Sequence, residues 1–332
     1  MKFWQKTLIA VTALVLFAGV AGLGYALWWL QAPLRIPSDQ VVMLERGEPF
    51  ARFAARLHDL GLIDHPRLWT LSARVSGDAR RVKAGEYRVR PGDSPQILMA
   101  RLMAGEVVTY QAQIVEGWTA MQALAMLRAD PVLRSTLDGV DADTLLEVLG
   151  LPPGHAEGMF FPDTYQFVRG DSDADILRRA YARMQSKLQA AWEERSASLP
   201  YDSPYEALIV ASLVEKETGR DVERPLIAQV FVLRLQLGMR LQTDPSVIYG
   251  IGEAFDGDLR RADLRRPTPY NTYVHRGLPP TPIALPGERS IIAALHPADG
   301  EYLFFVSRGD GSSKFSVSLE EHEQAVRRYQ LR

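Results

Sequence analysis

The 332-residue sequence predicts an α+β protein with a single N-terminal transmembrane helix. Three observations lead to this prediction: an uncharged apolar stretch near the N-terminus, short extended segments that each precede an amphipathic helix, and an apolar helix further along that ends in charged residues. We expect a cytoplasmic tail, membrane helix and linker over residues 1–36. A small βα subdomain should follow over 37–115, and a larger mixed α/β domain over 116–332.

Composition excludes several classes of function. The 38 basic and 40 acidic residues give a net charge of −2, which argues against a broad nucleic-acid surface. No cysteine is present, which excludes disulfides, thiolate zinc sites, iron–sulfur clusters and a cysteine nucleophile. The six histidines lack metal-site spacing, and no dinucleotide-binding, P-loop or G-x-S-x-G motif occurs. We therefore expect no metal, no cofactor and no nucleic-acid partner.

Residues 8–30 have the length and composition of a membrane span. As a helix this stretch would extend about 34 Å, enough to cross a bilayer core. Lys2 and Lys6 precede it, which predicts a cytoplasmic N-terminus and an external remainder. The alternatives are a cleaved signal peptide, whose apolar run is usually about 7–15 residues, and a buried soluble helix. The proline-containing stretch 31–39 predicts a short, stiff linker.

One pattern recurs three times between residues 40 and 127, from the small subdomain into the start of the larger domain. Each copy has an extended apolar residue, a turn with glycine and an amphipathic helix. In the second copy, Asp93 and Ser94 are placed to cap the helix. The run from Tyr87 to Ser94, followed by Ile97, resembles the opening of LysM modules. That resemblance implies binding of N-acetylglucosamine-containing glycans, and the alternative is a recurring strand–turn–helix unit without a binding role.

Patterns of apolar residues also predict the elements of the larger domain. Residues 173–194 should form a long surface helix that serves as scaffold, because apolar positions recur at i, i+4. Residues 207–214 are apolar all round and predict a buried helix. Residues 239–286 should be mostly loop, with a composition that favours an ordered binding surface. The remaining elements are a helix over 222–237, strands over 302–307 and 314–317, and a closing helix over 319–329.

Glu217 is the candidate general acid, because it extends the buried face of the apolar helix. Residues three, four and seven positions before it are apolar. Burial and the helix C-terminus both raise the pKa of a glutamate, and a carboxyl protonated near neutral pH is what a general acid needs. Glu215 lies about 200° away on the helix and cannot complete a carboxylate pair. A surface ion pair with Lys216, Arg220 or Arg224 is the alternative, and these patterns do not decide between the two.

Five motifs resemble the MltG (YceG-like) endolytic murein transglycosylases. They are Val-Glu-Lys-Glu-Thr at 214–218, the Leu-Gln-Thr-Asp-Pro block within 231–250, Pro-Tyr-Asn-Thr-Tyr at 269–273, Gly-Leu-Pro-Pro at 277–280 and residues 157–165. The resemblance implies a YceG-like catalytic domain. It also implies an enzyme of the bacterial inner membrane, with the catalytic part in the periplasm, that cleaves MurNAc–GlcNAc bonds inside nascent peptidoglycan. The products carry 1,6-anhydroMurNAc ends, and cleavage terminates glycan elongation. The implied partners are penicillin-binding proteins or other peptidoglycan synthases.

The resemblance also implies residue roles. The second glutamate of Glu-Lys-Glu is catalytic, which is Glu217 here, and one carboxylate suffices because the sugar supplies its own nucleophile. Glu215 is expected to support the fold through a buried hydrogen bond or ion pair. The candidates for sugar contact share amide, hydroxyl, carboxylate or aromatic groups: Gln242, Thr243, Asp244, Tyr270, Asn271, Tyr273, and, as a second wall, Glu157, Asp163, Thr164 and Tyr165.

Purely structural roles are the alternatives for these residues. Asp244 and Asn271 would then only build turns, and the second wall would only pack between domains. Two other functions compete with lytic cleavage. One is a non-catalytic, membrane-anchored scaffold that binds peptidoglycan and recruits synthases. The other is a glycan hydrolase in which Asp244 or Asp163 is the second carboxylate.

Overall fold

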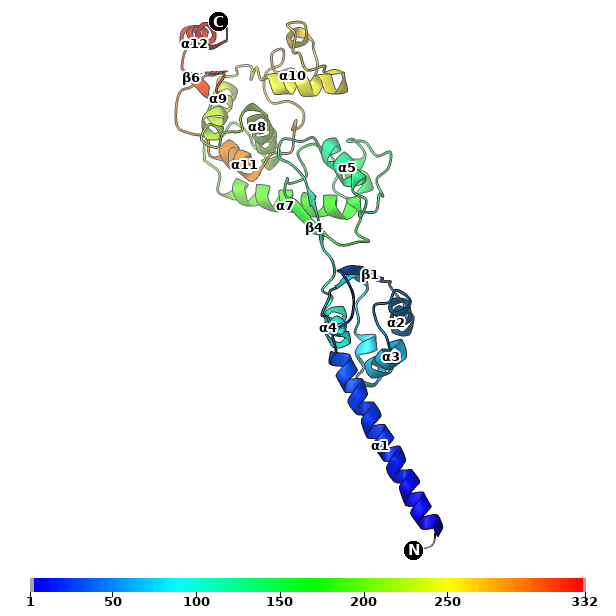
Figure 1. Cartoon of the computed structure of the whole chain (residues 1–332). Coiled ribbons are helices and arrows are strands. Elements are labelled where there is room, and N and C mark those ends of the chain that lie inside the picture. Colours follow the sequence, from blue (N-terminus) through cyan, green and yellow to red (C-terminus); the bar gives the residue numbers. More distant parts are fainter. Residues whose placement is uncertain (1–2, 331–332) are drawn as a thin grey trace. The chain divides into compact units, whose positions relative to one another are not determined.

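The structure is a computed structural model that describes residues 3–330 (Figure 1). The chain divides into two compact units, unit 1 up to Tyr110 and unit 2 from Gln111. The strands of the described residues form three two-stranded sheets, and helices make up most of the remaining regular structure. The predicted α+β class is therefore confirmed. The division at residue 110 lies close to the boundary expected after residue 115.

Unit 1 begins with the long helix α1 and continues as a small sheet covered by helices. Strands β1 and β2 pair antiparallel, with Val42 opposite Tyr87. Ser94 caps α4 by accepting a bond from the Ile97 N–H at 3.2 Å, as the sequence predicts. The elements are α1 (Phe3–Gln31), β1 (Gln40–Leu44), α2 (Phe50–Asp59), α3 (Pro66–Val75), the 3-10 helix η1 (Asp78–Arg80), β2 (Gly85–Val89) and α4 (Pro95–Ala104).

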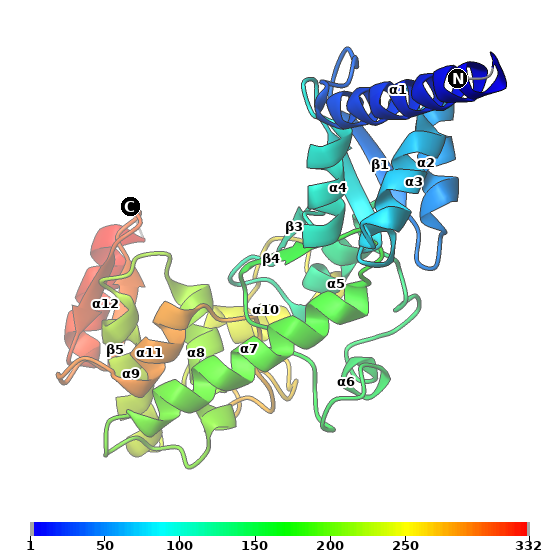
Figure 2. The same cartoon turned by 90° about the horizontal axis from the view of Figure 1, so that it is seen from below.

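Residues expected to form a short, stiff linker contribute to the core of unit 1. Leu34 and Ile36 are buried there, together with Trp29 from the last turn of α1. The Leu34 N–H donates to the carbonyl of Asp93. Figure 2 shows the end of α1 beside α4, which agrees with the contacts between these helices. Burial of Trp29, Leu34 and Ile36 therefore fixes the last turn of α1 and the segment after it to the core of unit 1.

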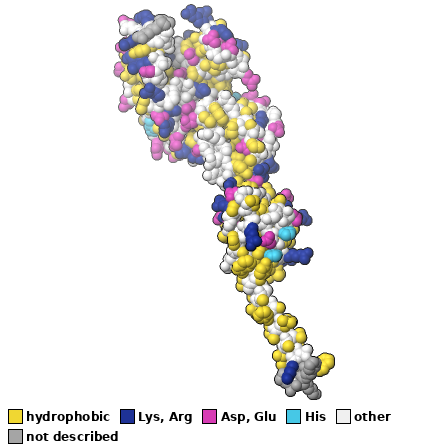
Figure 3. Space-filling model, viewed as in Figure 1, with side chains coloured by type: hydrophobic (Ala, Val, Ile, Leu, Met, Phe, Trp, Pro, Cys, Tyr) yellow, Lys and Arg dark blue, Asp and Glu magenta, His cyan; other side chains and the backbone are white. Residues whose placement is uncertain are grey.

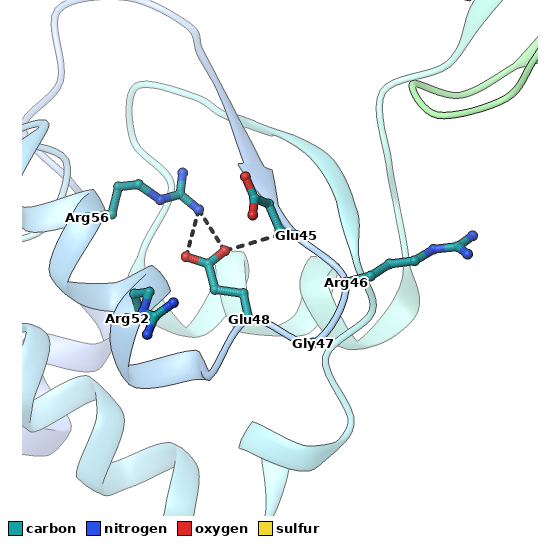
Figure 4. Close-up of a pocket in the computed structure, with 6 residues that line it drawn as sticks. All are labelled: Glu45, Arg46, Gly47, Glu48, Arg52 and Arg56. Carbon is teal, nitrogen blue, oxygen red and sulfur yellow. Dashed lines mark hydrogen bonds and ion pairs between the residues drawn. The ribbon is translucent and has the colours of Figure 1, made fainter. Parts of the chain in front are cut away.

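The turn between β1 and α2 carries a small charged hollow of about 330 Å³ (Figure 4). Gly47 has a positive φ of 78°, which lets the chain turn sharply into the helix. The Glu48 carboxylate accepts bonds from Arg56 at 2.8 and 3.0 Å and from the Glu45 N–H at 3.1 Å. Because the Glu48 carboxylate is bonded to Arg56 and to the Glu45 N–H, its role is to stabilise this turn. The hollow is lined by Glu45, Arg46, Gly47, Glu48, Arg52 and Arg56.

Unit 2 is built around the buried helix α8, which packs against α7, α9 and α11 (Figures 1 and 2). All eight residues from 207 to 214 are buried, as predicted. The elements are β3 (Tyr110–Gln113) at the junction, α5 (Ala120–Ala129), α6 (Leu145–Val148), β4 (Thr164–Phe167), α7 (Asp173–Glu193), α8 (Pro204–Glu217), α9 (Arg224–Gln236), α10 (Asp244–Ile251), the 3-10 helices η2 (Gly252–Ala254) and η3 (Asp263–Arg265), α11 (Glu288–Leu295), β5 (Phe304–Ser307), β6 (Ser313–Ser316) and α12 (Leu319–Tyr329).

Most predicted elements of unit 2 are found. The long helix over 173–194, the terminal hairpin and the closing helix correspond to α7, the β5–β6 pair and α12. One difference is α10, which lies inside the stretch 239–286 that we expected to be mostly loop. This eight-residue helix begins at Asp244-Pro245, and the dipeptide equally predicts a turn.

Candidate active site

Glu217 is the last residue of α8 and lines a cavity of about 470 Å³. The helix starts at Ser203, whose hydroxyl accepts a bond from the Glu206 N–H, and proline at the first position favours the same start. After Glu217 the chain leaves the helix at Thr218 with extended backbone angles. The Glu217 side chain is half-buried, with its carboxylate at the boundary between the core and the cavity.

The cavity has a polar side and a hairpin side. Glu217, Arg234, Gln242, Asp244 and Tyr273 form the polar side. The hairpin side is made by the β5–β6 hairpin, α12 and the residue after it. Its lining residues are Phe304, Phe305, Val306, Ser307, Ser313, Leu319, His322, Val326 and Gln330. The structure thus brings together Glu217 and three of the predicted sugar-contact residues, Gln242, Asp244 and Tyr273.

Thr243 holds the Glu217 carboxylate. Its hydroxyl donates a hydrogen bond to Oε1 of Glu217, and the side chain is almost fully buried. The Thr243 N–H donates to Oγ1 of Thr272 at 3.0 Å, and the Thr272 hydroxyl is 2.9 Å from that of Ser246. Because these hydroxyls are buried and bonded to one another, Thr243 presents its hydroxyl in a fixed direction.

Burial raises the pKa of Glu217 to about 7. The negative charge of Asp244 also raises it, whereas the Thr243 hydrogen bond and the positive charge of Arg234 lower it. A carboxyl with this pKa is about half protonated at neutral pH. It can therefore donate a proton and take one back, as a general acid and base must.

Arg234 is a site residue that the sequence analysis missed. It is buried in α9, where Nε donates to the Leu303 carbonyl at 2.7 Å and Nη1 to the Leu241 carbonyl at 2.6 Å. Its guanidinium lies 5.2 Å from the centre of the Phe304 ring. The available signal was an arginine flanked by apolar residues, in Val-Leu-Arg-Leu, inside a largely apolar helix, where its charge needs buried partners.

His322 stacks on Phe304 at the hairpin side of the cavity. The ring centres are 5.1 Å apart and the planes differ by 21°. Burial and the positive charge of Arg234 lower the pKa of His322 below its ordinary value. A neutral imidazole therefore faces the cavity at neutral pH. No motif surrounds His322 in the sequence, so its place in the site is recognisable only from the structure.

The loop around Gln242 is strained and aims its neighbours at the cavity. Among residues 3–330, Gln242 is the non-glycine residue with positive φ, at 51°. Its N–H donates to the Thr272 carbonyl at 3.2 Å. The next acidic residue, Asp244, accepts a hydrogen bond from the Tyr273 hydroxyl at 2.6 Å. Such sparsely populated backbone angles cluster at functional sites.

Two other predicted sugar-contact residues, Asn271 and Tyr270, do not line this cavity. Asn271 is fully buried, and its amide nitrogen donates to the carbonyls of Asp263 and Arg266 at 3.1 and 2.7 Å. Its Oδ1 accepts a bond from the Tyr273 N–H at 2.9 Å, so Asn271 positions Tyr273. The Tyr270 hydroxyl is 2.9 Å from Oγ1 of Thr281. Neither Asn271 nor Tyr270 is among the residues that line the Glu217 cavity.

Glu157 is a second carboxyl with a raised pKa. It is almost fully buried, and burial raises its pKa to about 7. Oε1 accepts from the Ala120 N–H at 2.9 Å and Oε2 from the Tyr249 hydroxyl at 3.2 Å. Glu157 is not among the residues lining the Glu217 cavity. Its partners are the first residue of α5 and a tyrosine of α10.

The other members of the predicted second wall lie around β4. Asp163 forms an ion pair with Arg183 at 2.6 Å, and Thr164 is exposed. The Tyr165 hydroxyl donates to the Phe161 carbonyl at 2.6 Å. Within the described part of the chain, these three residues do not line the cavity that holds Glu217.

Glu215 is bonded on the opposite side of α8. Its carboxylate accepts from the Gly287 N–H at 3.0 Å and the Ser290 hydroxyl at 2.7 Å, and it pairs with the buried Arg224 at 3.5 Å. These partners join α8 to the start of α11 and to α9. No group of three or more histidine, aspartate or glutamate side chains that could hold a metal ion occurs among residues 3–330.

Comparison with known proteins places the chain in a family. A sequence profile of the YceG-like family matches residues 42–328. The chain belongs to the YceG-like family. It is 29% identical over 306 residues to the endolytic murein transglycosylase of Bacillus subtilis (strain 168), covering 87% of this chain and 84% of that relative. This YceG-like chain is also 26% identical to the endolytic murein transglycosylase of Streptococcus pneumoniae (strain D39 / NCTC 7466), with 98% of the chain aligned.

The YceG-like chain spans 65% of the length of the Streptococcus pneumoniae relative. A solved structure is also similar, the crystal structure of a yceG-like protein from Listeria monocytogenes. It has a TM-score of 0.55 and 27% sequence identity, and covers 87% of this chain and 99% of that one. The family resemblance predicted from the motifs is confirmed.

Proposed function

We propose that this chain is a membrane-anchored endolytic murein transglycosylase. It cleaves the MurNAc–GlcNAc bond inside peptidoglycan strands, leaves 1,6-anhydroMurNAc ends and so terminates glycan elongation. The observation that carries this proposal is the carboxyl of Glu217, lining a cavity with a pKa raised to about 7 and bonded to Thr243. The names of the relatives in Bacillus subtilis and Streptococcus pneumoniae support the same activity.

In the first step Glu217 acts as the acid. Its carboxyl proton passes to the glycosidic oxygen, and the bond from that oxygen to C1 of MurNAc breaks. The leaving GlcNAc keeps a neutral hydroxyl, and positive charge develops at C1. Glu217 is then a carboxylate, which the positive charge of Arg234 stabilises, since that charge lowers the pKa of Glu217.

In the second step the same residue acts as the base. The Glu217 carboxylate takes the proton from the C6 hydroxyl of MurNAc, and O6 bonds to C1. No water is consumed, and the carboxyl regains its proton. A second catalytic carboxylate is unnecessary because the sugar carries the nucleophile. This scheme uses a single carboxyl whose pKa lies near the working pH, as Brønsted behaviour favours.

The surrounding residues position the carboxyl and the sugar. Thr243 fixes the direction of Oε1 of Glu217, and the Asp244–Tyr273 hydrogen bond sets the orientation of the phenol ring at the cavity. We assign sugar contact to Gln242, Asp244 and Tyr273, since these side chains line the cavity. Asn271 supports this wall by accepting a hydrogen bond from the Tyr273 N–H.

Product analysis tests the proposal against its main rival. Purified glycan strands are incubated with the protein, and the masses of the released fragments are measured by mass spectrometry. Lytic cleavage gives anhydro ends with no mass gain, whereas a hydrolase adds one water per cut. The rival deserves the test because Asp244, a second carboxylate, lines the same cavity as Glu217. Fragments carrying the added water would overturn the lytic assignment, and the Glu217→Gln variant shows whether any cleavage depends on this residue.

We also propose that α1 spans the inner membrane, with a cytoplasmic N-terminus and unit 2 in the periplasm. Residues 4–31 form a helix that is long and apolar enough to cross a membrane, and its most apolar part is not buried against the rest of the protein. Peptidoglycan synthases are the proposed partners, since strands must be cut while they grow. Glycan binding by the LysM-like opening of β2 and α4 stays a prediction. Pelleting of the protein with insoluble peptidoglycan measures it.

A further inference from the structure

The last turns of α1 are built into unit 1. Trp29 belongs to the buried core, with 5% of its surface exposed. One helical turn earlier, the Tyr25 hydroxyl lies 2.7 Å from Nε2 of His65. The rings of Trp29 and His65 meet edge to face, with centres 5.5 Å apart. His65 immediately precedes α3, so α3 starts at the level of Tyr25 on α1.

The apolar part of α1 before Tyr25 is long enough to cross a bilayer by itself. Residues 7–24 carry no charge and would extend about 27 Å as a helix, close to the roughly 30 Å of a hydrocarbon core. Tyr25 then lies at the membrane–water boundary on the periplasmic side, and tyrosine is enriched at such boundaries. Because His65 contacts Tyr25, α3 lies at that boundary as well.

One face of α3 is exposed and amphipathic. Leu71 and Val75 are 60% and 81% exposed, and Arg67 and Arg74 on the same face are exposed too. The spacing of these four residues places them on one side of a helix. The opposite side buries Trp69 and Ala73 in the core of unit 1.

The charge around this face is positive, although the whole chain is slightly acidic. Residues 60–83 contain five basic and two acidic side chains. Arg67, Arg74 and Arg80 form no ion pair with any residue that the structure describes. Arg74 and Arg80 also line a shallow hollow of about 600 Å³ at the end of α3. Figure 3 shows hydrophobic side chains gathered at the end of unit 1 from which α1 extends.

We propose that the exposed face of α3 docks on the anionic lipid surface of the bilayer that α1 spans. Arg67, Arg74 and Arg80 contact lipid phosphates, and Leu71 and Val75 enter the boundary between headgroups and acyl chains. The inference rests on the proposed membrane anchor. It adds that unit 1 lies on the membrane surface instead of extending from it on a linker.

Site-directed spin labelling of the full chain tests this docking. The absence of native cysteine lets single substitutions carry a nitroxide at Leu71→Cys or Val75→Cys. Val41→Cys is the matched control, because Val41 is 49% exposed. It belongs to β1, the strand that Figure 1 shows at the end of unit 1 away from the N-terminus of α1. Gly19→Cys reports on α1, since a side chain at this position meets no neighbour. The labelled protein is reconstituted in phosphatidylethanolamine–phosphatidylglycerol vesicles.

Collision with oxygen, which concentrates in lipid, is compared with collision with a water-soluble nickel chelate. We expect the oxygen-to-nickel ratio at Leu71 and Val75 to exceed that at Val41 several-fold. Replacing Arg67, Arg74 and Arg80 together by glutamine should lower the ratio at Leu71 toward the Val41 value. A lipid-like ratio at Gly19 with water-like ratios at Leu71 and Val75 overturns the docking and keeps the anchor. Water-like ratios at all four positions overturn both.

Discussion

The hydroxyl of Thr243 donates a hydrogen bond to Oε1 of Glu217, joining the N-cap of α10 to the last residue of α8. The two residues lie on separate elements, and Thr243 is held in place because its N–H donates to the Thr272 hydroxyl and its carbonyl accepts from the Ser246 hydroxyl. The contact stabilises the charged form of Glu217 and sets the direction of its carboxylate, while burial favours the protonated form. The opposing effects of the hydrogen bond and of burial leave the pKa of Glu217 at about 7, so the carboxyl can give up and take back a proton near neutral pH.

Replacing Glu217 by glutamine should abolish lytic cleavage while leaving the fold intact. Glutamine has nearly the same shape but has no acidic proton to donate, and loss of acid–base catalysis costs about 10²–10⁴-fold. The measurement is the amount of anhydro ends released from purified strands, with circular dichroism as the check on folding. Glu253→Gln, at an exposed position, is the control and should keep full activity. Equal activity of the Glu217 variant and the wild type would remove Glu217 from the mechanism.

Replacing Thr243 by valine should raise the pKa of Glu217 and slow the reaction. The Thr243 hydrogen bond lowers that pKa, so its loss moves the alkaline limb of the pH–rate profile to higher pH. The rate at the optimum falls because the carboxylate loses its orientation. Thr243→Ser keeps the hydroxyl and should stay close to the wild-type profile. A profile of Thr243→Val that coincides with the wild type would show that the contact has no catalytic effect.

The rate of cleavage should fall as the pH rises through about 7. Glu217 must be protonated in the free enzyme to act as the acid, and its pKa is raised to about 7. Above that pH the protonated fraction decreases about tenfold per pH unit. Initial rates at low substrate concentration report this limb, and thermal melts at each pH exclude unfolding as its cause. A rate that stays constant from pH 6 to 9 contradicts the assignment.

Replacing Glu157 by glutamine should stabilise the protein at high pH. Burial raises the pKa of Glu157 from an ordinary value near 4.5 to about 7, so the folded state binds the proton more tightly. The wild type therefore loses stability as the pH rises from about 4.5 through 7, by at most about 3 kcal/mol. Glutamine does not ionise, so the variant should exceed the wild-type free energy of unfolding at pH 8. The difference should shrink toward pH 5, as denaturant titrations at both pH values would measure.

Replacing Glu215 by alanine should destabilise the fold by about 2–4 kcal/mol. The change leaves the Gly287 N–H and the Ser290 hydroxyl without their acceptor and removes a partner of the buried Arg224. Denaturant unfolding measures the loss, with Glu253→Ala as the exposed control, expected within about 0.5 kcal/mol. A loss confined to activity, with unchanged stability, would reassign Glu215 to the reaction.

Local patterns predicted much of this molecule. Seven apolar residues among the eight from 207 to 214 predicted the buried helix α8, and helical spacing placed Glu217 on its buried face. The periodicity over 173–194 predicted α7. These features depend on side chains close in sequence, so their spacing carries the information.

Other features depend on contacts between distant segments. Arg234 is recognisable as a site residue only once the carbonyls of Leu241 and Leu303 are seen to hold it beside the cavity. Asn271 and Tyr273 belong to one motif, yet the fold of the loop turns only the tyrosine toward the cavity. The apolar run of α1 does not distinguish the residues that are exposed in the structure, such as Leu14 and Phe17, from Trp29, which is buried against unit 1.

Glu217 precedes, along the chain, every other residue that lines its cavity. Ribosomes make proteins from the N-terminus, so α8 is complete before Arg234, Thr243 and the β5–β6 hairpin exist. Until those segments fold onto it, the glutamate is surrounded by water and has the pKa of an ordinary carboxyl. In a half-made or unfolded chain this carboxyl is therefore protonated in less than about 1% of molecules at neutral pH. The raised pKa of Glu217 therefore requires the complete fold. Cleavage of peptidoglycan is thereby restricted to fully synthesised, folded molecules.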